Sequence, residues 1–414
     1  MQNEYLALLR TNKNYRLLWC GAVASFLGDW FNTIALYVIV QRLTGSPLAL
    51  GAVFITKMLP FALGSPLAGL LTDRFSRRRL MIATDVLRAV IVLGFLLVDK
   101  PSELPLLYAL ISLQVLLSSL FITARMASIP NITTSEELPV ANALSAATWS
   151  VILAIGAAIG GVVTDLLGTD AVFLIDSATY VVSAWFIWQT VIPQQTDALE
   201  PGANLRTALA DIVKGWRHMI EHPDIGRVAS AKALWSVGGG GLVFMLAILG
   251  ERLFPGAAGL GIGILYSVRG VGTGVGPLLA RRWIPDERRW PSVLGTTILA
   301  CGLGYVAIAL LPWSPWWSIA LLVGLAHAPS GVNWVFSSVL LQRRTEDRFR
   351  GRVVATQWLM LTAADSLSIL AAALLLEVGS VELRTAILAF AVVEVLCGSV
   401  WLLWVLPAER RQAS

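Results

Sequence analysis

Long apolar stretches alternate with short polar connections along the whole chain. A helix needs about 20 predominantly apolar residues to cross the hydrocarbon core of a bilayer, so each stretch of that length predicts one membrane crossing. The pattern therefore predicts an all-α integral membrane protein. The predicted crossings number twelve, at residues 17–40, 48–71, 79–98, 104–124, 141–166, 171–192, 228–250, 260–281, 291–312, 316–340, 353–377 and 383–406.

Lysine and arginine residues are divided unequally between the two sides that alternate connections define. One side carries repeated arginine clusters, whereas the other has only Arg42, Lys100, Arg252 and Arg384. Because positively charged loops remain in the cytoplasm, this asymmetry predicts that both termini are cytoplasmic. We expect a multi-pass protein of the cell's inner (plasma) membrane.

The longest connection lies near the middle of the chain. It predicts an N-terminal six-helix half at residues 1–192, a cytoplasmic linker at 193–227 and a C-terminal six-helix half at 228–414. Within the linker, residues 205–221 have apolar side chains at helical spacing, which predicts an amphipathic helix on the membrane surface. His218 and His222 could form half of a metal site, but the sequence has no further His or Cys nearby, so we predict no metal and no cofactor.

Corresponding features recur at a nearly fixed spacing in the two halves. The acidic loops at Glu136 and Glu346 are 210 residues apart (346 − 136), and the arginine pairs that begin at Arg77 and Arg288 are 211 apart (288 − 77). Similar offsets from unrelated loops are typical of parallel structural repeats. They predict two six-helix pseudo-repeats.

Composition excludes an ordinary soluble protein. The chain has 414 residues, of which 56% are hydrophobic and 14% charged, whereas soluble domains have about 25% charged residues. The net charge of +5 lies in loops between apolar stretches, so we predict no nucleic-acid partner. No Walker phosphate loop and no cluster of nucleophilic or acid–base residues occurs in the sequence, which argues against an ATP-driven pump and against an enzyme.

One polar connection, residues 69–79, differs from the other cationic loops. It contains, in order, Gly69, Asp73, Arg74, Arg77 and Arg78. A carboxylate there can interact with a neighbouring helix end, and the arginines hold the turn on the cytoplasmic side. A plain positive-inside loop would explain the arginines but not Asp73 or Gly69. The spacing resembles the hinge motif between helices 2 and 3 of the major facilitator superfamily, with Ser76 where that motif usually has glycine.

Other stretches resemble the efflux branch of this superfamily, which includes macrolide exporters and enterobactin-type siderophore exporters. They are residues 14–19, 27–30, 269–270 and 348–353. The resemblance covers nearly the whole chain and implies the major facilitator fold. In the fifth predicted helix, the Gly-Pro pair that antiporters prefer is replaced by Gly156-Ala157. Gly160 and Gly161 follow, and these small residues permit close helix contact.

Ionisable residues inside predicted crossings cost about 2.5–3.5 kcal/mol each on insertion scales, so each needs a partner, a water-filled cavity or a function. Our candidates for proton coupling or for a substrate cavity are Asp29, Lys57, Arg269 and Asp365. Asp29 is the first choice, because the resemblance implies that its helix lines the central cavity, where desolvation favours a protonated carboxyl. A structural ion pair with Lys57 or Arg269 is the alternative.

Two further sets of intramembrane charges have structural interpretations. Asp85 and Arg88 are three residues apart on one predicted helix face, which predicts an ion pair that supports the hinge. Glu394 lies in the last predicted helix, which in the resembling fold usually lies outside the cavity. We interpret it as a satisfied polar contact.

These observations favour a secondary transporter, not an enzyme, that exports an amphipathic drug, macrolide or siderophore in exchange for protons. The alternatives are an exporter or flippase of a lipid or metabolite, and a membrane receptor that transports nothing. The expected partners are a small-molecule substrate, protons and the lipid bilayer, and the chain is expected to act as a monomer.

Overall fold

The computed structural model describes residues 4–193 and 205–413, and nearly all of them are helical. Eleven helices among the described residues are long and apolar enough to cross a membrane. The all-α membrane class that the sequence predicts is therefore confirmed. Contacts divide the chain into two compact units, residues 1–44 with 56–209 and residues 45–55 with 210–414. The predicted division at residues 192 and 227 stays a prediction.

The helices of the first unit begin where polar or proline residues interrupt the apolar pattern. They are α1 (Glu4–Thr11), α2 (Lys13–Thr44), most of α3 (Pro47–Arg74), α4 (Arg77–Leu93), α5 (Leu104–Ile132) and α6 (Glu137–Trp188). Ser76 is the N-cap residue of α4. Glu103, just before α5, accepts hydrogen bonds from the backbone N–H groups of Asp99 and Lys100 at 2.7 and 3.1 Å. These side chains satisfy backbone donors at the helix ends.

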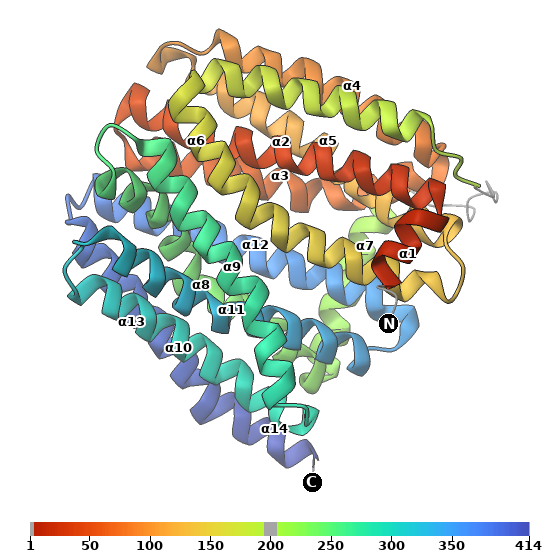
Figure 1. The fold of residues 1–414 in the computed structure, drawn as a ribbon. Helices are drawn as coiled ribbons and strands as arrows, with labels where there is room; N and C mark the ends of the chain where they lie inside the picture. The colour runs from red at the N-terminus through yellow and green to blue at the C-terminus, as the bar shows by residue number, and fades with distance from the viewer. Residues whose placement is uncertain (1–3, 194–204, 414) are drawn as a thin grey trace. The chain divides into compact units, whose positions relative to one another are not determined.

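The helix α6 contains two membrane crossings. Its 52 residues would extend about 78 Å if straight, more than twice the hydrocarbon thickness. Gly168 interrupts it with φ 82° and ψ 167°, a conformation that is essentially restricted to glycine. The two parts turn back on each other there (Figure 1), and they correspond to the predicted crossings at residues 141–166 and 171–192. Counted this way, the eleven long helices give twelve crossings.

Glycine allows the first part of α6 to approach α2 closely. A Cβ atom on Gly160 would lie 2.9 Å from the Cα of Phe31, and one on Gly156 would lie 2.9 Å from the Cβ of Trp30. The predicted small-residue contact of this helix is therefore with α2. Gly161 is also buried.

We expect Gly160→Ala to destabilise the first unit. The new methyl group meets backbone, so α2 and α6 must separate, which costs about 1–3 kcal/mol. Denaturant unfolding of the purified protein in detergent measures this change. Gly351→Ala is the matched control, because its Cβ would meet no atom within 4 Å. Equal unfolding midpoints for Gly160→Ala and wild type would show that the close contact is not required.

The second unit contains the remaining helices. They are α7 (Leu205–Glu221, from residue 210), α8 (Pro223–Leu253), α9 (Ala258–Trp283), α10 (Trp290–Leu310), α11 (Trp316–Arg344), α12 (Asp347–Glu377), α13 (Leu383–Val400) and α14 (Leu406–Ala413). A short 3-10 turn, Glu287–Arg289, precedes α10, and a π-helical turn, Trp401–Val405, joins α13 to α14. Trp290 stacks on Phe336 with ring centroids 4.1 Å apart, which fixes the start of α10 against α11.

The helix starts repeat with the spacing that the sequence predicts. The first residues of α2 and α8, Lys13 and Pro223, are 210 apart (223 − 13), and those of α6 and α12, Glu137 and Asp347, are also 210 apart (347 − 137). The two six-helix pseudo-repeats are therefore present in the structure.

The predicted linker helix is α7. His218 stacks on Phe349 of α12 at 4.2 Å with an 8° interplanar angle, and the backbone carbonyl of Ile212 accepts a hydrogen bond from Thr356. The opposite face exposes a row of apolar side chains, Val213, Trp216 and Ile220. Such a face suits the membrane surface that the sequence predicts. No metal-ligand group of three or more residues occurs in the described chain. The first part of the linker, residues 194–204, lies outside the described residues.

Candidate functional site

Asp29 lies at the centre of a polar cluster inside the first unit. Tyr180, from the second part of α6, donates a hydrogen bond of 2.5 Å to Oδ1 of Asp29. Arg88 of α4 places Nη1 3.8 Å from Oδ2 of the same carboxylate. The predicted first-choice carboxylate is thus held by a phenol and a guanidinium.

Both terminal nitrogens of the Arg88 guanidinium have polar partners, and two aromatic rings contact its faces. It pairs with Asp85 one turn earlier on α4 and donates a hydrogen bond of 3.2 Å to Ser118. It also lies over the rings of Phe121 and Tyr180, 4.6 and 4.3 Å from their centroids. Arg88 and Asp85 are almost completely buried, with side chains 1% and 0% exposed. These contacts make Arg88 a rigid cation that faces Asp29.

The Asp85–Arg88 ion pair that the spacing predicts is therefore present. Beyond that pair, Arg88 contacts Asp29 and its neighbours rather than the hinge. Within the described residues, neither side chain has an assigned hydrogen bond or ion pair to the hinge at residues 69–78. Its role as a support of the hinge stays a prediction.

Further polar residues extend the cluster through neighbouring helices. Asn32, one turn after Asp29 on α2, donates a hydrogen bond of 2.7 Å to the buried carboxylate of Asp176. Gln114 of α5 donates one of 2.8 Å to the Tyr180 hydroxyl. Lys57 of α3 interacts electrostatically with both Asp29 and Asp176. Side chains from α2, α4, α5 and α6 therefore meet around Asp29, and Lys57 of α3 adds a positive charge to the cluster.

The charges of the cluster do not balance when every group is ionised. Three carboxylates, Asp29, Asp85 and Asp176, face two cations, Lys57 and Arg88. Asp29 is the accessible carboxylate of the three, because its side chain is 30% exposed whereas Asp85 and Asp176 are fully buried. An exchangeable cation or proton would most easily reach Asp29.

The second unit contains its own polar cluster around Arg269 of α9. Arg269 interacts electrostatically with Asp365 of α12 and with His327 of α11. Its guanidinium carbon lies 5.8 Å from the Tyr266 ring centroid. His327 shares a hydrogen bond of 2.7 Å with the hydroxyl of Tyr305. No ion pair within 4 Å joins Arg269 to Asp365 in the described part of the chain.

Glu394 of α13 is completely buried, and neither of its carboxylate oxygens has an assigned hydrogen bond to another described residue. The neighbouring Cys301 thiol interacts with this carboxylate electrostatically. A Cβ atom on Gly238 of α8 would lie 2.7 Å from the Cβ of Glu394, so α8 and α13 pack tightly there. The satisfied polar contact that we expected for Glu394 is therefore weak.

Two arginines of the hinge motif connect the start of α4 to the C-terminal parts of α5 and α6 by hydrogen bonds. Arg77 donates hydrogen bonds to the Ala127 carbonyl and to the Asn131 side chain near the end of α5, at 2.6 and 2.9 Å. Arg78 donates to the last carbonyls of α6, at Ile187 and Trp188. Arginine is favourable there because its positive charge lies near the negative C-terminal ends of α5 and α6.

The acidic residue of the hinge differs from its arginines. Asp73 lies exposed in the last turn of α3, and no hydrogen bond or ion pair to it is found within the described residues. A Cβ atom on Gly69 would meet nothing within 4 Å. Arg74 is also exposed. The contacts within the first unit therefore explain Arg77 and Arg78 but not Gly69 or Asp73.

Sequence reasoning missed Tyr180, Gln114 and Asn32 as members of the Asp29 cluster. Gln114 is an isolated amide within an apolar helix, and Tyr180 follows Asp176 by one helical turn. Both features are visible in the sequence, but neither indicates that these side chains meet Asp29 until the helices are placed.

Comparisons with known sequences match this chain to one family model and to two relatives that are named as exporters. The sequence model described as Major Facilitator Superfamily matches residues 18–254. The chain is 25% identical to the putative bacilysin exporter BacE of Bacillus subtilis over 356 residues, which covers 83% of this chain and 84% of that protein. It is 26% identical to the enterobactin exporter EntS of Shigella boydii over 359 residues, covering 84% and 82%.

Solved structures with little sequence identity share the fold. A bacterial homolog of the human lysosomal transporter Spinster, in an inward-facing and unoccupied conformation, matches with a TM-score of 0.70 at 16% identity and covers 95% of this chain and 97% of that one. The POT family transporter PepTSo matches with a TM-score of 0.71 at 12% identity, covering 96% and 99%. At these identities the likeness concerns the fold alone.

Proposed function

The chain belongs to the Major Facilitator Superfamily, and on that premise we propose that it exports an amphipathic small molecule by proton-coupled alternating access. Relatives named as exporters of bacilysin and enterobactin support the direction and the class of substrate. They cover more than four fifths of the chain at 25–26% identity. The substrate is a drug, macrolide or siderophore-like compound.

The observation that carries the proposal is the charge imbalance of the Asp29 cluster. Three carboxylates against two cations leave one negative charge, and an uncompensated charge at membrane depth is costly. A proton on Asp29 removes that charge, and so does a cationic group of a substrate. Protons and substrate therefore compete for one carboxylate, which is the basis of exchange between them.

Each polar group has a role in this scheme. Tyr180 and Arg88 orient the Asp29 carboxylate. Lys57 is a counter-charge to Asp29 and Asp176 in the first unit. Arg269 and Asp365 supply the substrate contacts of the second unit. The binding chemistry requires no catalytic residue and no cofactor.

The protein is proposed to act as a monomer in the plasma membrane with both termini cytoplasmic. The arginines at the ends of α3, α9 and α11 support this orientation, because they lie at ends that the positive-inside rule assigns to the cytoplasm.

A comparison of cells with and without the protein tests the proposed function. Growth inhibition by a panel of amphipathic compounds, together with the metabolites released into the medium, should identify compounds that the protein removes from cells. Each compound is then tested for flux in proteoliposomes that contain the purified protein. Binding of a compound without any flux would indicate a receptor and overturn the proposal.

We predict that Asp73→Asn shifts the protein toward the inward-open state. The carboxylate is proposed to accept hydrogen bonds from a helix end of the other half when the cytoplasmic side is closed. The amide would lose roughly 1–3 kcal/mol of charge-assisted bonding. That loss shifts a balanced equilibrium by about tenfold.

Spin labels at the exposed positions Glu136 and Gln342 report the separation of the cytoplasmic ends, in a background that lacks the three native cysteines. We expect a larger population of long distances and slower transport in Asp73→Asn. The control Asp99→Asn makes the same change in an exposed loop beyond the other end of α4. An unchanged distance distribution and transport rate in Asp73→Asn would reduce Asp73 to a part of the orientation signal.

A further inference from the structure

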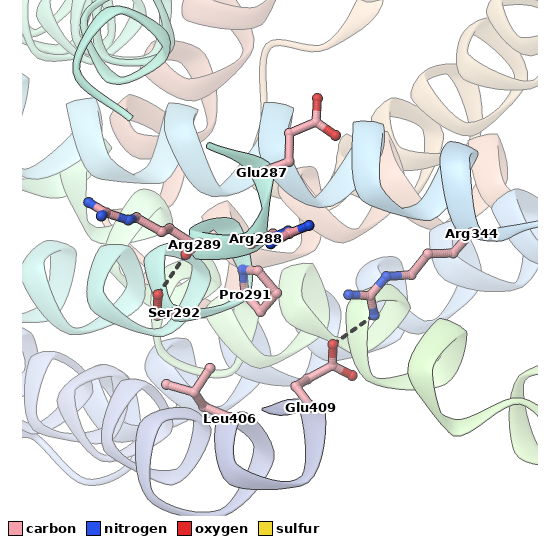
Figure 2. A pocket seen from close by; sticks show the side chains of 8 residues that line it. All are labelled: Glu287, Arg288, Arg289, Pro291, Ser292, Arg344, Leu406 and Glu409. Carbon is pink, nitrogen blue, oxygen red and sulfur yellow. Dashed lines mark hydrogen bonds and ion pairs between the residues drawn. The ribbon is translucent and has the colours of Figure 1, made fainter. Parts of the chain in front are cut away.

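A basic pocket lies in the second unit at the start of α10. Its volume is about 580 Å³, and its lining includes Arg288, Arg289, Ser292, Arg344 and Glu409. These residues come from three separate stretches of the chain (Figure 2), namely the 3-10 turn with the first turn of α10, the end of α11 and the helix α14. The pocket is not part of the polar clusters described above.

The two acids that line the pocket are already neutralised. Glu409 is 4% exposed and accepts hydrogen bonds from Arg227 at 2.5 Å and from Arg344 at 2.7 Å. Glu287 pairs with Arg343. The side chain of Arg344 is also fixed by the Asp224 carbonyl at 2.9 Å. Arg344 is therefore held rigidly at the pocket wall, with only part of its hydrogen-bonding capacity used.

The remaining arginines supply uncompensated positive charge. No hydrogen bond or ion pair of the Arg288 side chain is found among the described residues, and Figure 2 shows this side chain between Arg289 and Arg344. Among the described residues, the Arg289 side chain has one ion pair, an exposed one of 3.8 Å with Asp286, and such pairs contribute little. Ser292 donates its hydroxyl hydrogen to the Arg289 carbonyl, so the positive charge and the N–H donors of the pocket come from the arginines. The pocket therefore suits an anion with several oxygen atoms.

The surroundings indicate the depth of the pocket in the membrane. Trp283, at the end of α9, and Trp404, in the π-helical turn, are 72% and 71% exposed. Both lie a few residues from positions that line the pocket. Exposed tryptophans favour the headgroup level of a bilayer, and basic pockets at that level on the cytoplasmic side bind lipid phosphates.

We propose that this pocket binds the phosphate group of an anionic phospholipid of the cytoplasmic leaflet. Arg288 and Arg289 contact the phosphate oxygens, and Arg344, held by Glu409, completes the site. The acyl chains leave along the surface that carries Trp283 and Trp404. The site does not depend on the transported compound or on proton coupling.

Native mass spectrometry of the full chain in detergent tests the proposal with phosphatidylglycerol as the probe. The wild type should retain phosphatidylglycerol in preference to zwitterionic phosphatidylcholine. Arg288→Gln with Arg289→Gln should weaken this retention by about tenfold, because two charge-assisted contacts are lost. Both side chains are exposed, so the double variant should unfold at the same temperature as the wild type when no lipid is added.

The matched control is Arg281→Gln with Arg282→Gln. It removes the same two charges from exposed positions at the end of α9, outside the pocket lining. Retention should be unchanged in this control. Equal loss in the two double variants would show a nonspecific effect of net charge and overturn the site, as would unchanged retention in the Arg288 and Arg289 variant.

Competition distinguishes the lipid from a soluble phosphate. Inorganic phosphate and glycerol 3-phosphate, added at millimolar concentration, should not displace phosphatidylglycerol, because they lack the acyl chains. Complete displacement by either compound would assign the pocket to a soluble phosphate and overturn the lipid proposal. None of these readouts involves flux, so the proposal can fail while the proposed transport function holds.

Discussion

Replacement of Asp29 by Asn should abolish export driven by a pH gradient while the protein remains folded in the membrane. The amide keeps the volume of the side chain and can still accept the hydrogen bond from Tyr180, but it cannot bind and release a proton. Arg88 retains its pair with Asp85, so no buried charge is left without a partner. We expect the rate to fall to that of vesicles without the protein.

The measurement is flux of an identified substrate into vesicles with an imposed pH gradient. Asp170→Asn is the matched control, because it makes the same chemical change at an exposed position of α6 and should retain the wild-type rate. The amounts of folded protein in the membrane are compared for each variant. A wild-type rate in Asp29→Asn would remove Asp29 from the coupling mechanism.

The second large effect concerns stability. Arg88→Gln should destabilise the first unit by roughly 3–5 kcal/mol, the usual cost of removing one partner from a buried ion pair. Asp85 would lose the cation that neutralises it at a fully buried position. The cation–π contacts with Phe121 and Tyr180 would also be lost.

A double-mutant cycle separates the ion pair from these other losses. The double variant Asp85→Asn, Arg88→Gln removes both charges of the pair, so it should be more stable than Arg88→Gln alone, which leaves the buried Asp85 carboxylate without its cation. Denaturant unfolding in detergent gives the free energies for the four proteins. If the single variant does not fold, the double variant should still yield purified protein. An Arg88→Gln variant as stable as the wild type would show that Asp85 needs no cation.

Local patterns in the sequence predict the architecture well. The lengths of the apolar stretches predict the membrane crossings. The offset between Glu136 and Glu346 predicts the two pseudo-repeats, which the first residues of the helices confirm. Even the separation within α6 follows from the sequence, because Gly168 lies between two stretches that are each long enough to cross a membrane.

The candidate site could be predicted only in part. Asp29 is recognisable as an acid within an apolar helix, and Asp85 and Arg88 are neighbours by helical spacing, so both required only local information. The contact between Tyr180 and Asp29 joins residues 151 positions apart. It depends on the rotation of α2 and α6 about their axes, which the apolar pattern of a fully membrane-embedded helix does not determine, since lipid and protein surroundings are both apolar.

The pocket at the start of α10 illustrates the same limit. Arg288, Arg344 and Glu409 each appear in the sequence as members of cationic, positive-inside segments. Their meeting depends on α14, which continues α13, lying beside the start of α10, and the sequence pattern does not indicate this packing. Three ordinary interfacial charges become a site only through tertiary structure.

The central claim is that a proton gradient drives export, and flux in proteoliposomes under a gradient of controlled sign tests it most directly. The membrane potential is clamped to zero, and an identified substrate is present at equal concentration on both sides. Proton-coupled exchange predicts net substrate movement opposite to the proton gradient, with a reversed direction when the gradient is reversed. Substrate movement that is independent of the size and sign of the pH gradient would contradict proton coupling.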